Sequence, residues 1–272
     1  MKRETNSASA GMAHQLRLFF VALEFFTRLP VPRWVGFDPL WSREAARFLP
    51  LVGWLVGVVG AVVAALSALV LPPVVALLLS MLTTIVLTGA LHEDGWADLC
   101  DGFGGGHTRA RMLEIMRDPR LGAFGVIGLL GMLALKFAAL QSMPSQVVAL
   151  VLVAHPLSRL AALAVMWRLD YVRPEGKAKA VGESLSGAGF CFAGFTVLIP
   201  LALLQYSQLA LSWAALALGV TLAVVATVCL ARLLQRRLGG YTGDCLGAVQ
   251  QLTELVFYLG ALAVLHNPGL LG

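Results

Sequence analysis

Long apolar segments recur from one end of this chain to the other, and they restrict the possible folds more than any other feature. The chain is 58% hydrophobic and only 13% charged, so it is far more apolar than an average soluble domain. A helix needs about 20 apolar residues to cross the hydrocarbon layer of a bilayer. The sequence therefore predicts an all-α, polytopic membrane helix bundle. The apolar segments lie approximately at 50–71, 74–91, 121–141, 146–167, 188–204, 211–230 and 245–265.

The same pattern indicates one domain, because no polar linker is long enough to divide the apolar segments. We expect a single membrane domain over residues 1–272, in which residues 1–13 form a flexible, basic tail without the features of a secretory signal. Residues 15–29 are apolar but short and carry Glu24 and Arg28, which favours an interfacial or re-entrant helix over a full span. The four cysteines are scattered, so neither a disulfide framework nor a zinc site is indicated.

Basic residues fall on one side of the predicted topology. Eighteen of the twenty Lys and Arg residues lie in the N-terminal region, the stretch after the second segment, the loop after the fourth or the stretch before the last. The opposite turns and the C-terminal tail hold none, and only Lys136 and Arg159 lie within segments. Because basic loops collect in the cytoplasm, we expect all polar motifs to face that compartment.

Acidic residues, arginines and glycines are concentrated between Leu91 and Gly125. Within this stretch, Asp94, Asp98 and Asp101 are spaced so that a helix would bring them within an arc of about 60°. At ~6 Å and an effective dielectric constant of ~20, each pair would repel by roughly 3 kcal/mol. A solvated acidic helix end is one interpretation of this spacing. In so apolar a chain we favour a divalent metal site, and oxygen ligands of this kind suit Mg²⁺.

Several motifs occur in an order that resembles one family across nearly the whole chain. They are LHEDGWADLCDG, then RMLEIMRDPRLGAFG, then Ser158-Arg159, and finally GGYTGDCLGA; an early FFTRLPVP also fits. Together they resemble the cobalamin synthases, the adenosylcobinamide-GDP ribazoletransferase family. By analogy, the aspartates are similar to those of CDP-alcohol phosphotransferases, which hold metal at a membrane surface.

The resemblance implies a reaction in a late step of cobalamin biosynthesis. α-Ribazole or its 5′-phosphate would attack the phosphate of adenosylcobinamide-GDP, giving adenosylcobalamin or its phosphate, with GMP as the leaving group. Asp94, Asp98 and Asp101 would hold Mg²⁺, with Asp98, Asp101 and Asp118 as the catalytic acids. The predicted substrate-binding residues are Arg109, Arg111, Arg120, Arg159 and Asp244.

Some of these residues have a second interpretation. Asp118 is either a general base or the N-cap of the segment at 121–141, and Asp244 either caps the last segment or contacts substrate. Arg159 is expected to meet substrate or an acid rather than to extend toward the membrane surface, whereas for Lys136 we expect that extension. Glu254 lies within an apolar segment and therefore requires a partner or a polar cavity.

Two other classes of protein are compatible with part of this pattern. A cation- or proton-coupled transporter would also carry intramembrane acids, but near the middle of the bilayer rather than after a span. A scaffold subunit would not explain the clustered aspartates. We therefore expect a Mg²⁺-dependent transferase in a bacterial inner membrane, with a lipid bilayer around it and no nucleic-acid partner. The oligomeric state is left open, a homo-oligomer included.

Overall fold

The protein is an all-helical bundle in the computed structural model, which describes residues 2–36, 38, 41–173, 185–207, 209 and 211–267. Over these residues the single β contact is an isolated bridge between Tyr171 and Tyr241. The helices are α1 (Lys2–Phe26), α2 (Trp41–Ala45), α3 (Leu49–Ser67), α4 (Pro73–Thr88), α5 (Leu91–Gly105), α6 (Arg109–Ile115), α7 (Ala123–Gln141), α8 (Val147–Arg168), α10 (Gly187–Gln205), α11 (Trp213–Leu238) and α12 (Gly243–His266), with 3-10 turns at Arg33–Val35, Ala46–Phe48 and Pro144–Gln146.

Five helices are long and apolar enough to cross a membrane, which confirms the predicted fold class. They are α3 and α8, each with the 3-10 turn before it, together with α7, α11 and α12. The helices α4 and α5 meet this criterion only as a pair, and α10 contains a shorter apolar stretch at Gly187–Ala202. The expected spans at 74–91 and 188–204 are therefore shorter than a full crossing when each is taken alone.

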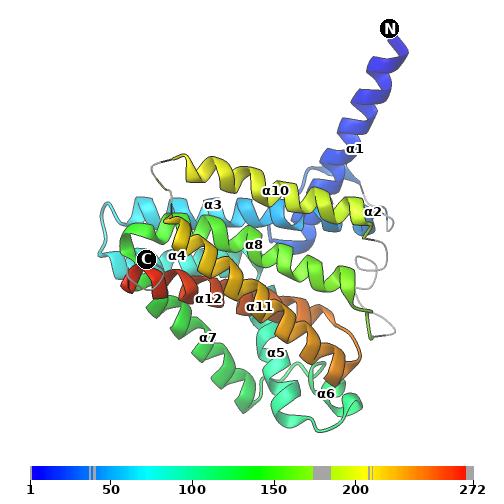
Figure 1. Cartoon of the computed structure of the whole chain (residues 1–272). Coiled ribbons are helices and arrows are strands. Elements are labelled where there is room, and N and C mark those ends of the chain that lie inside the picture. The colour runs from blue at the N-terminus through cyan, green and yellow to red at the C-terminus, as the bar shows by residue number, and fades with distance from the viewer. Residues whose placement is uncertain are drawn as a thin grey trace.

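The helix ends divide between two sides of the bundle (Figure 1). The facing ends of α3 and α4, of α7 and α8, and of α10 and α11 lie on one side, together with the C-terminal end of α12, and α5 and α6 lie on the other. This arrangement matches the alternation expected from the apolar segments. The first turns of α1, which include the predicted flexible tail, project away from the bundle.

A sharp bend between α4 and α5 turns the acidic helix away from the axis of α4. The two helices meet at 86°, because Gly89 and Ala90 both adopt left-handed backbone conformations, with φ of 65° and 58°. Glycine adopts this conformation readily, whereas alanine does so at a steric cost. Arg28 packs against Gly89, and its backbone N–H donates to the Leu87 carbonyl oxygen at 2.7 Å. The segment after α1 thus supports the bend.

Candidate active site

The acidic helix α5 packs with its backbone against the first turns of α12. A Cβ atom at Gly95 would lie 2.6 Å from the Asp244 carbonyl oxygen, and one at Gly247 would lie 3.1 Å from the His92 Cα atom. Both positions therefore need glycine for this close approach. The order of these contacts shows that the two helices run in opposite directions. Asp244 at the start of α12 is thereby placed beside the middle of α5.

Three carboxylates gather at this contact. Asp94 is exposed, whereas Asp98 and Asp244 are partly buried. The charges of Asp244 and Asp94, and to a smaller extent that of Asp101, act on Asp98, and the charge of Asp94 also acts on Asp244. Such mutual repulsion favours a bound cation or a proton. The structure thus joins Asp244 to two of the predicted metal ligands, an association between residues about 150 positions apart that helical spacing alone cannot reveal.

Asp244 is not the cap of α12, which corrects one of its two predicted roles. The cap is Thr242, whose hydroxyl oxygen accepts a hydrogen bond from the Cys245 N–H at 3.3 Å. Asp244 lies in the first turn of the helix, and its carboxylate lies in the acidic cluster, where Oδ2 accepts hydrogen bonds from Arg173 and Thr242.

The predicted ligand Asp101 has a different set of contacts. Its two carboxylate oxygens accept hydrogen bonds from the backbone N–H groups of Gly122 and Gly125, both at 2.7 Å. These are donors at the start of α7, where helix N–H groups lack partners within the helix. Asp101 therefore caps α7 from a neighbouring helix. Each of its oxygens keeps a further lone pair, so its assignment as a metal ligand stays a prediction.

Asp118 does not cap α7, because that helix begins at Ala123 and its terminal donors are bound by Asp101. Instead, Asp118 accepts hydrogen bonds from Arg120 Nε at 2.9 Å and Arg120 Nη2 at 2.6 Å. The side-chain and backbone hydrogen bonds from Arg120 lower the pKa of Asp118 to about 2. A carboxylate this acidic is a weak base at neutral pH.

The predicted phosphate-binding arginines lie at the surface. Arg120 is paired with Asp118, and Arg111 is paired with Glu114 at 2.9 Å. Arg109 is exposed and lies beside Gly239, where a Cβ atom would be 3.4 Å from its Nη1 atom. None of them donates to the three clustered carboxylates in any contact among the described residues.

An arginine that the sequence did not single out reaches the acidic cluster. Arg173 Nη2 donates to Asp244 Oδ2 at 2.7 Å and to the Met116 carbonyl oxygen at 3.1 Å, and the Arg173 side chain is 13% exposed. Its backbone is held by pairing with the glycine-rich motif before α12: the Val172 N–H donates to the Tyr241 carbonyl oxygen, and the Tyr241 N–H donates to Asp170. The two paired stretches, residues 170–173 and 239–244, are separated by about 70 positions in the sequence, so only the fold brings them together.

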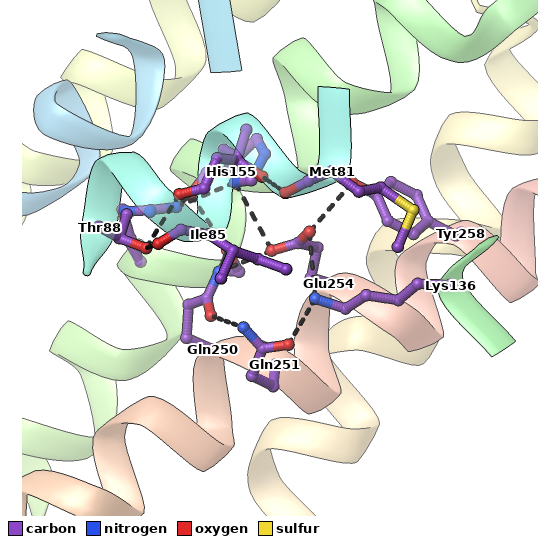
Figure 2. A network of polar contacts seen from close by, with 12 residues as sticks. Met81, Ile85, Thr88, Lys136, His155, Gln250, Gln251, Glu254 and Tyr258 are labelled. Atoms are coloured by element: carbon purple, nitrogen blue, oxygen red, sulfur yellow. Dashed lines mark hydrogen bonds and ion pairs between the residues drawn. The ribbon is translucent and has the colours of Figure 1, made fainter. Parts of the chain in front are cut away.

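A second polar group lies inside the bundle, around Glu254 (Figure 2). Lys136 Nζ lies 3.2 Å from Glu254 Oε1 and donates to Gln251 Oε1 at 2.7 Å, while Gln250 Nε2 donates to Glu254 Oε2 at 2.6 Å. The prediction that Glu254 has a partner is confirmed. The prediction that Lys136 extends toward the membrane surface is wrong, because this side chain is 5% exposed and its charge is satisfied by an acid on the neighbouring helix.

Arg159 also belongs to this interior group rather than to the acidic cluster. It is 1% exposed and donates from Nη1 to the His155 carbonyl oxygen at 3.0 Å. Its interior position agrees with the expectation that it does not extend toward the membrane surface. Its predicted contact with substrate stays a prediction.

Comparison with known proteins places this arrangement in a family. The family model for cobalamin-5-phosphate synthase matches residues 18–262 of this chain. The chain belongs to the cobalamin-5-phosphate synthase family. Two relatives named adenosylcobinamide-GDP ribazoletransferase support this: that of Leptothrix cholodnii is 46% identical, covering 93% of this chain and 98% of the relative, and that of Ralstonia nicotianae is 43% identical, covering 91% and 95%. The transferase of Vibrio cholerae is 36% identical over 95% of this chain and 98% of its own length. No solved structure matches the chain.

The oxygen donors of the acidic cluster suit Mg²⁺, the metal that we expected from the sequence. Asp94, Asp98 and Asp244 supply carboxylate oxygens only, which are the ligands that Mg²⁺ prefers. Within the described ranges, however, no three His, Cys, Asp or Glu side chains are already arranged to hold a metal ion. The carboxylate of Asp244 forms an ion pair with Arg173. The residues therefore fit Mg²⁺ by their chemistry, and the metal site stays a prediction.

Proposed function

We propose that the acidic cluster between α5 and α12 is the active site of an adenosylcobinamide-GDP ribazoletransferase. The protein transfers the adenosylcobinamide phosphate moiety from adenosylcobinamide-GDP to α-ribazole or its 5′-phosphate, and GMP is released. The observation that carries the site assignment is the gathering of Asp94, Asp98 and Asp244 with Arg173 at one place, in a chain that aligns with named transferases over almost its whole length.

In our proposal a bound metal ion balances the negative charge of the diphosphate substrate. A bound Mg²⁺ would neutralise the diphosphate of the substrate and stabilise charge on the leaving phosphate. Asp94 and Asp98 would hold it from α5, with Asp244 from α12 and Asp101 as further candidates. The half-buried position of Asp98 between two other acids supports it as the central ligand.

Arg173 is the cation best placed to bind a phosphate oxygen. Its guanidinium already lies against the acids, and its buried Nε atom has no hydrogen-bond partner. Arginine presents its donors in a planar fork that matches phosphate oxygens. In our proposal the diphosphate takes up these donors, while the exposed arginines Arg109, Arg111 and Arg120 contribute to substrate binding from the rim.

The transfer itself requires one bond to form and one to break. The hydroxyl oxygen of ribazole attacks the cobinamide-side phosphorus, the bond from that phosphorus to the GMP oxygen breaks, and the hydroxyl proton leaves to a base or to water. Asp118 was the predicted base. Its pairing with Arg120 supports a role in positioning the loop before α7 rather than in removing this proton.

The location of the reaction is a further part of the proposal. We place the protein in a bacterial inner membrane with the acidic cluster at its cytoplasmic face. The one-sided distribution of Lys and Arg supports this orientation. The cluster also lies where α5 and α12 meet on the side that carries α6 (Figure 1).

The decisive experiment measures GMP release from adenosylcobinamide-GDP by purified protein in proteoliposomes, with α-ribazole and Mg²⁺ present or withheld. We expect release only when both are present. We expect Arg173→Ala to raise KM for the diphosphate substrate about tenfold or more and Arg173→Lys to recover part of that loss. Glu44→Gln, at an exposed position 55% accessible to solvent, is the matched control. Ion uptake without GMP release would instead identify a transporter.

A further inference from the structure

A small cavity lies inside the bundle, in the midst of the group around Glu254. Its volume is about 30 Å³, and α4, α5, α7, α8 and α12 all contribute side chains to its wall. Figure 2 shows Glu254, Gln250 and Gln251 of α12 meeting Lys136 of α7 and His155 of α8 at this place. The carboxylates of the proposed active site do not line it. The interior group therefore needs an explanation of its own.

Unsatisfied polar atoms are concentrated in the wall of this cavity. The described residues contain six buried side-chain nitrogen or oxygen atoms without a hydrogen-bond partner, and three of them belong to residues that line it. These are His92 Nε2, Glu93 Oε2 and Arg159 Nε, on side chains that are 6%, 9% and 1% exposed. Leaving a buried polar atom unpaired costs roughly 1–3 kcal/mol, so three such atoms around one space indicate a polar occupant.

The charges around the cavity bear on the kind of occupant. When Glu93 and Glu254 are both ionised, their charges balance those of Lys136 and Arg159, so with neutral histidines the wall has no net charge. Such a site attracts neither a cation nor an anion from water. One water molecule needs about 10–15 Å³ of a volume measured in this way, so a cavity of 30 Å³ has room for about two.

We propose that this cavity binds about two water molecules, which bridge His92 Nε2, Glu93 Oε2 and Arg159 Nε, and that the hydrated group holds the acidic helix α5 in position. A water molecule both donates and accepts, so it satisfies the carboxylate oxygen and the guanidinium nitrogen at the same time. The histidine nitrogen is satisfied in either tautomer.

The connection to α5 runs through Gln251. Its Nε2 donates to Glu93 Oε1 at 2.7 Å, and its Oε1 accepts from Lys136. Glu93 immediately precedes Asp94, so a hydrogen bond that fixes the first turn of α5 against α12 also fixes where the clustered acids lie. This matters for α5 in particular, because no side chain caps its N-terminus, where Ala90 has a left-handed conformation. Glu93 and Gln251 are therefore positioning residues, and this part of the inference rests on the proposed function.

The water molecules are tested directly by a high-resolution structure of the full-length protein in a lipid nanodisc. We expect ordered density within hydrogen-bonding distance of all three atoms, at separations of about 2.7–3.2 Å. Direct pairing of these atoms with one another, density for an acyl chain, or a metal-like peak at about 2.0–2.6 Å from several oxygens would each overturn the proposal. This measurement does not depend on which reaction the protein catalyses.

The positioning role is tested by Gln251→Met, which removes the hydrogen bonds of the Gln251 side chain to Glu93, Lys136 and Gln250 at nearly constant volume. Because Gln251 touches no substrate in our proposal, we expect kcat to fall about tenfold or more with little change in KM, since a displaced reacting group slows the chemical step. Glu44→Gln is again the control, with unchanged kcat. An unchanged kcat for Gln251→Met in a folded protein would refute the role. An inactive wild-type protein would refute the proposed function instead.

Coupling within the interior group is tested on the ion pair between Lys136 and Glu254. Removing Lys136 or Glu254 alone leaves a buried charge uncompensated, whereas removing both does not. We expect Lys136→Met and Glu254→Gln to lower the melting temperature individually, and the double variant Lys136→Met/Glu254→Gln to recover most of the loss. Equal and additive losses would show that this group is not coupled in the way that the proposal requires.

Discussion

At the scale of single residues, Asp98 has the most demanding environment in the acidic cluster. It is half-buried between other acids, so in our proposal bound Mg²⁺ relieves repulsion in the folded protein. A ligand that binds only the folded state raises the melting temperature. We expect Mg²⁺ to stabilise the wild-type protein in detergent and Asp98→Asn to lose most of this stabilisation.

The control for this prediction is Asp118→Asn, because the carboxylate of Asp118 is paired with Arg120. It should retain the response to Mg²⁺. The same increase in melting temperature for the wild-type protein and for the Asp94→Asn/Asp98→Asn/Asp101→Asn variant would show that the metal binds elsewhere.

Asp118 itself gives a prediction about pH. Its pKa is lowered to about 2 by hydrogen bonds from Arg120. The contribution of a lowered pKa to stability is present above the ordinary aspartate value of about 3.9 and is lost as pH falls through the folded value. Asp118 therefore stays ionised throughout the range in which the activity can be assayed. The acid limb of the pH–rate profile should keep its midpoint in Asp118→Asn, and a shifted midpoint would restore Asp118 as the base.

The residues that sequence reasoning found and missed differ in a physical way. Asp94 and Asp98 could be predicted because helical spacing is local and places both on one face. Arg173 could not, because its contact with Asp244 depends on the pairing of two loops far apart in the sequence. Lys136 was misinterpreted for the same reason: a lysine near a helix end ordinarily extends toward water, and only the fold supplies Glu254 as its partner.

At the scale of elements, the start of α7 depends on contact between Asp101 and two glycines. A Cβ atom at Gly125 would collide with Asp101 Oδ2 and would lie 2.8 Å from Leu121 Cδ1. Gly131 is in the same helix, but a Cβ atom there would meet nothing within 4 Å. We expect Gly125→Ala to lower both the melting temperature and the activity, because the cap must move and α5 with it.

Gly131→Ala is the matched control, since alanine favours a helix over glycine by about 1 kcal/mol. It should leave the activity unchanged and the melting temperature equal or higher. Comparable losses in both variants, measured by thermal unfolding and GMP release, would mean that α7 tolerates no added methyl group at all and that the capping contact has no special importance.

Helix boundaries were predictable where they follow from apolar length. The expected segments at 121–141 and 146–167 agree closely with α7 and α8. Thr108 caps α6 by accepting from the Arg111 N–H, which is the ordinary role of a threonine before a helix. The bend after α4 was not predictable, because it requires a left-handed alanine. The charged stretch at 232–238 simply continues α11, since nothing in it ends a helix before Gly239.

At the scale of the whole molecule, polar groups occupy two separate levels. The acidic cluster lies where α5 meets the start of α12, on the side of the bundle that carries α6, and the Glu254 group lies farther along α12, inside the bundle (Figure 1). The second level resembles what a transporter would require, yet its acids and bases are equal in number, and Lys136 is paired with Glu254. Composition alone could not separate these two levels, because it counts acids and bases without giving their positions.

Orientation in the membrane is the prediction that tests the whole arrangement. All basic loops lie on one side of the expected topology, so that side should face the cytoplasm.

The orientation is tested by labelling single cysteines. We replace the native cysteines with serine or alanine, because Cys191 and Cys229 are exposed. We then introduce one cysteine at a time at an exposed position, which is His107, Arg236, Ser145 or Tyr206. A membrane-impermeant maleimide applied to intact cells should label the Ser145 and Tyr206 variants. The His107 and Arg236 variants should react only after the membrane is opened, because they lie beside the acidic helix or at the end of α11. Variants that retain GMP release are the ones to interpret, since the label must report the native orientation. The reverse pattern would place the acidic cluster outside the cell, away from a cytoplasmic supply of the nucleotide-linked substrate, and would overturn the proposed site of reaction.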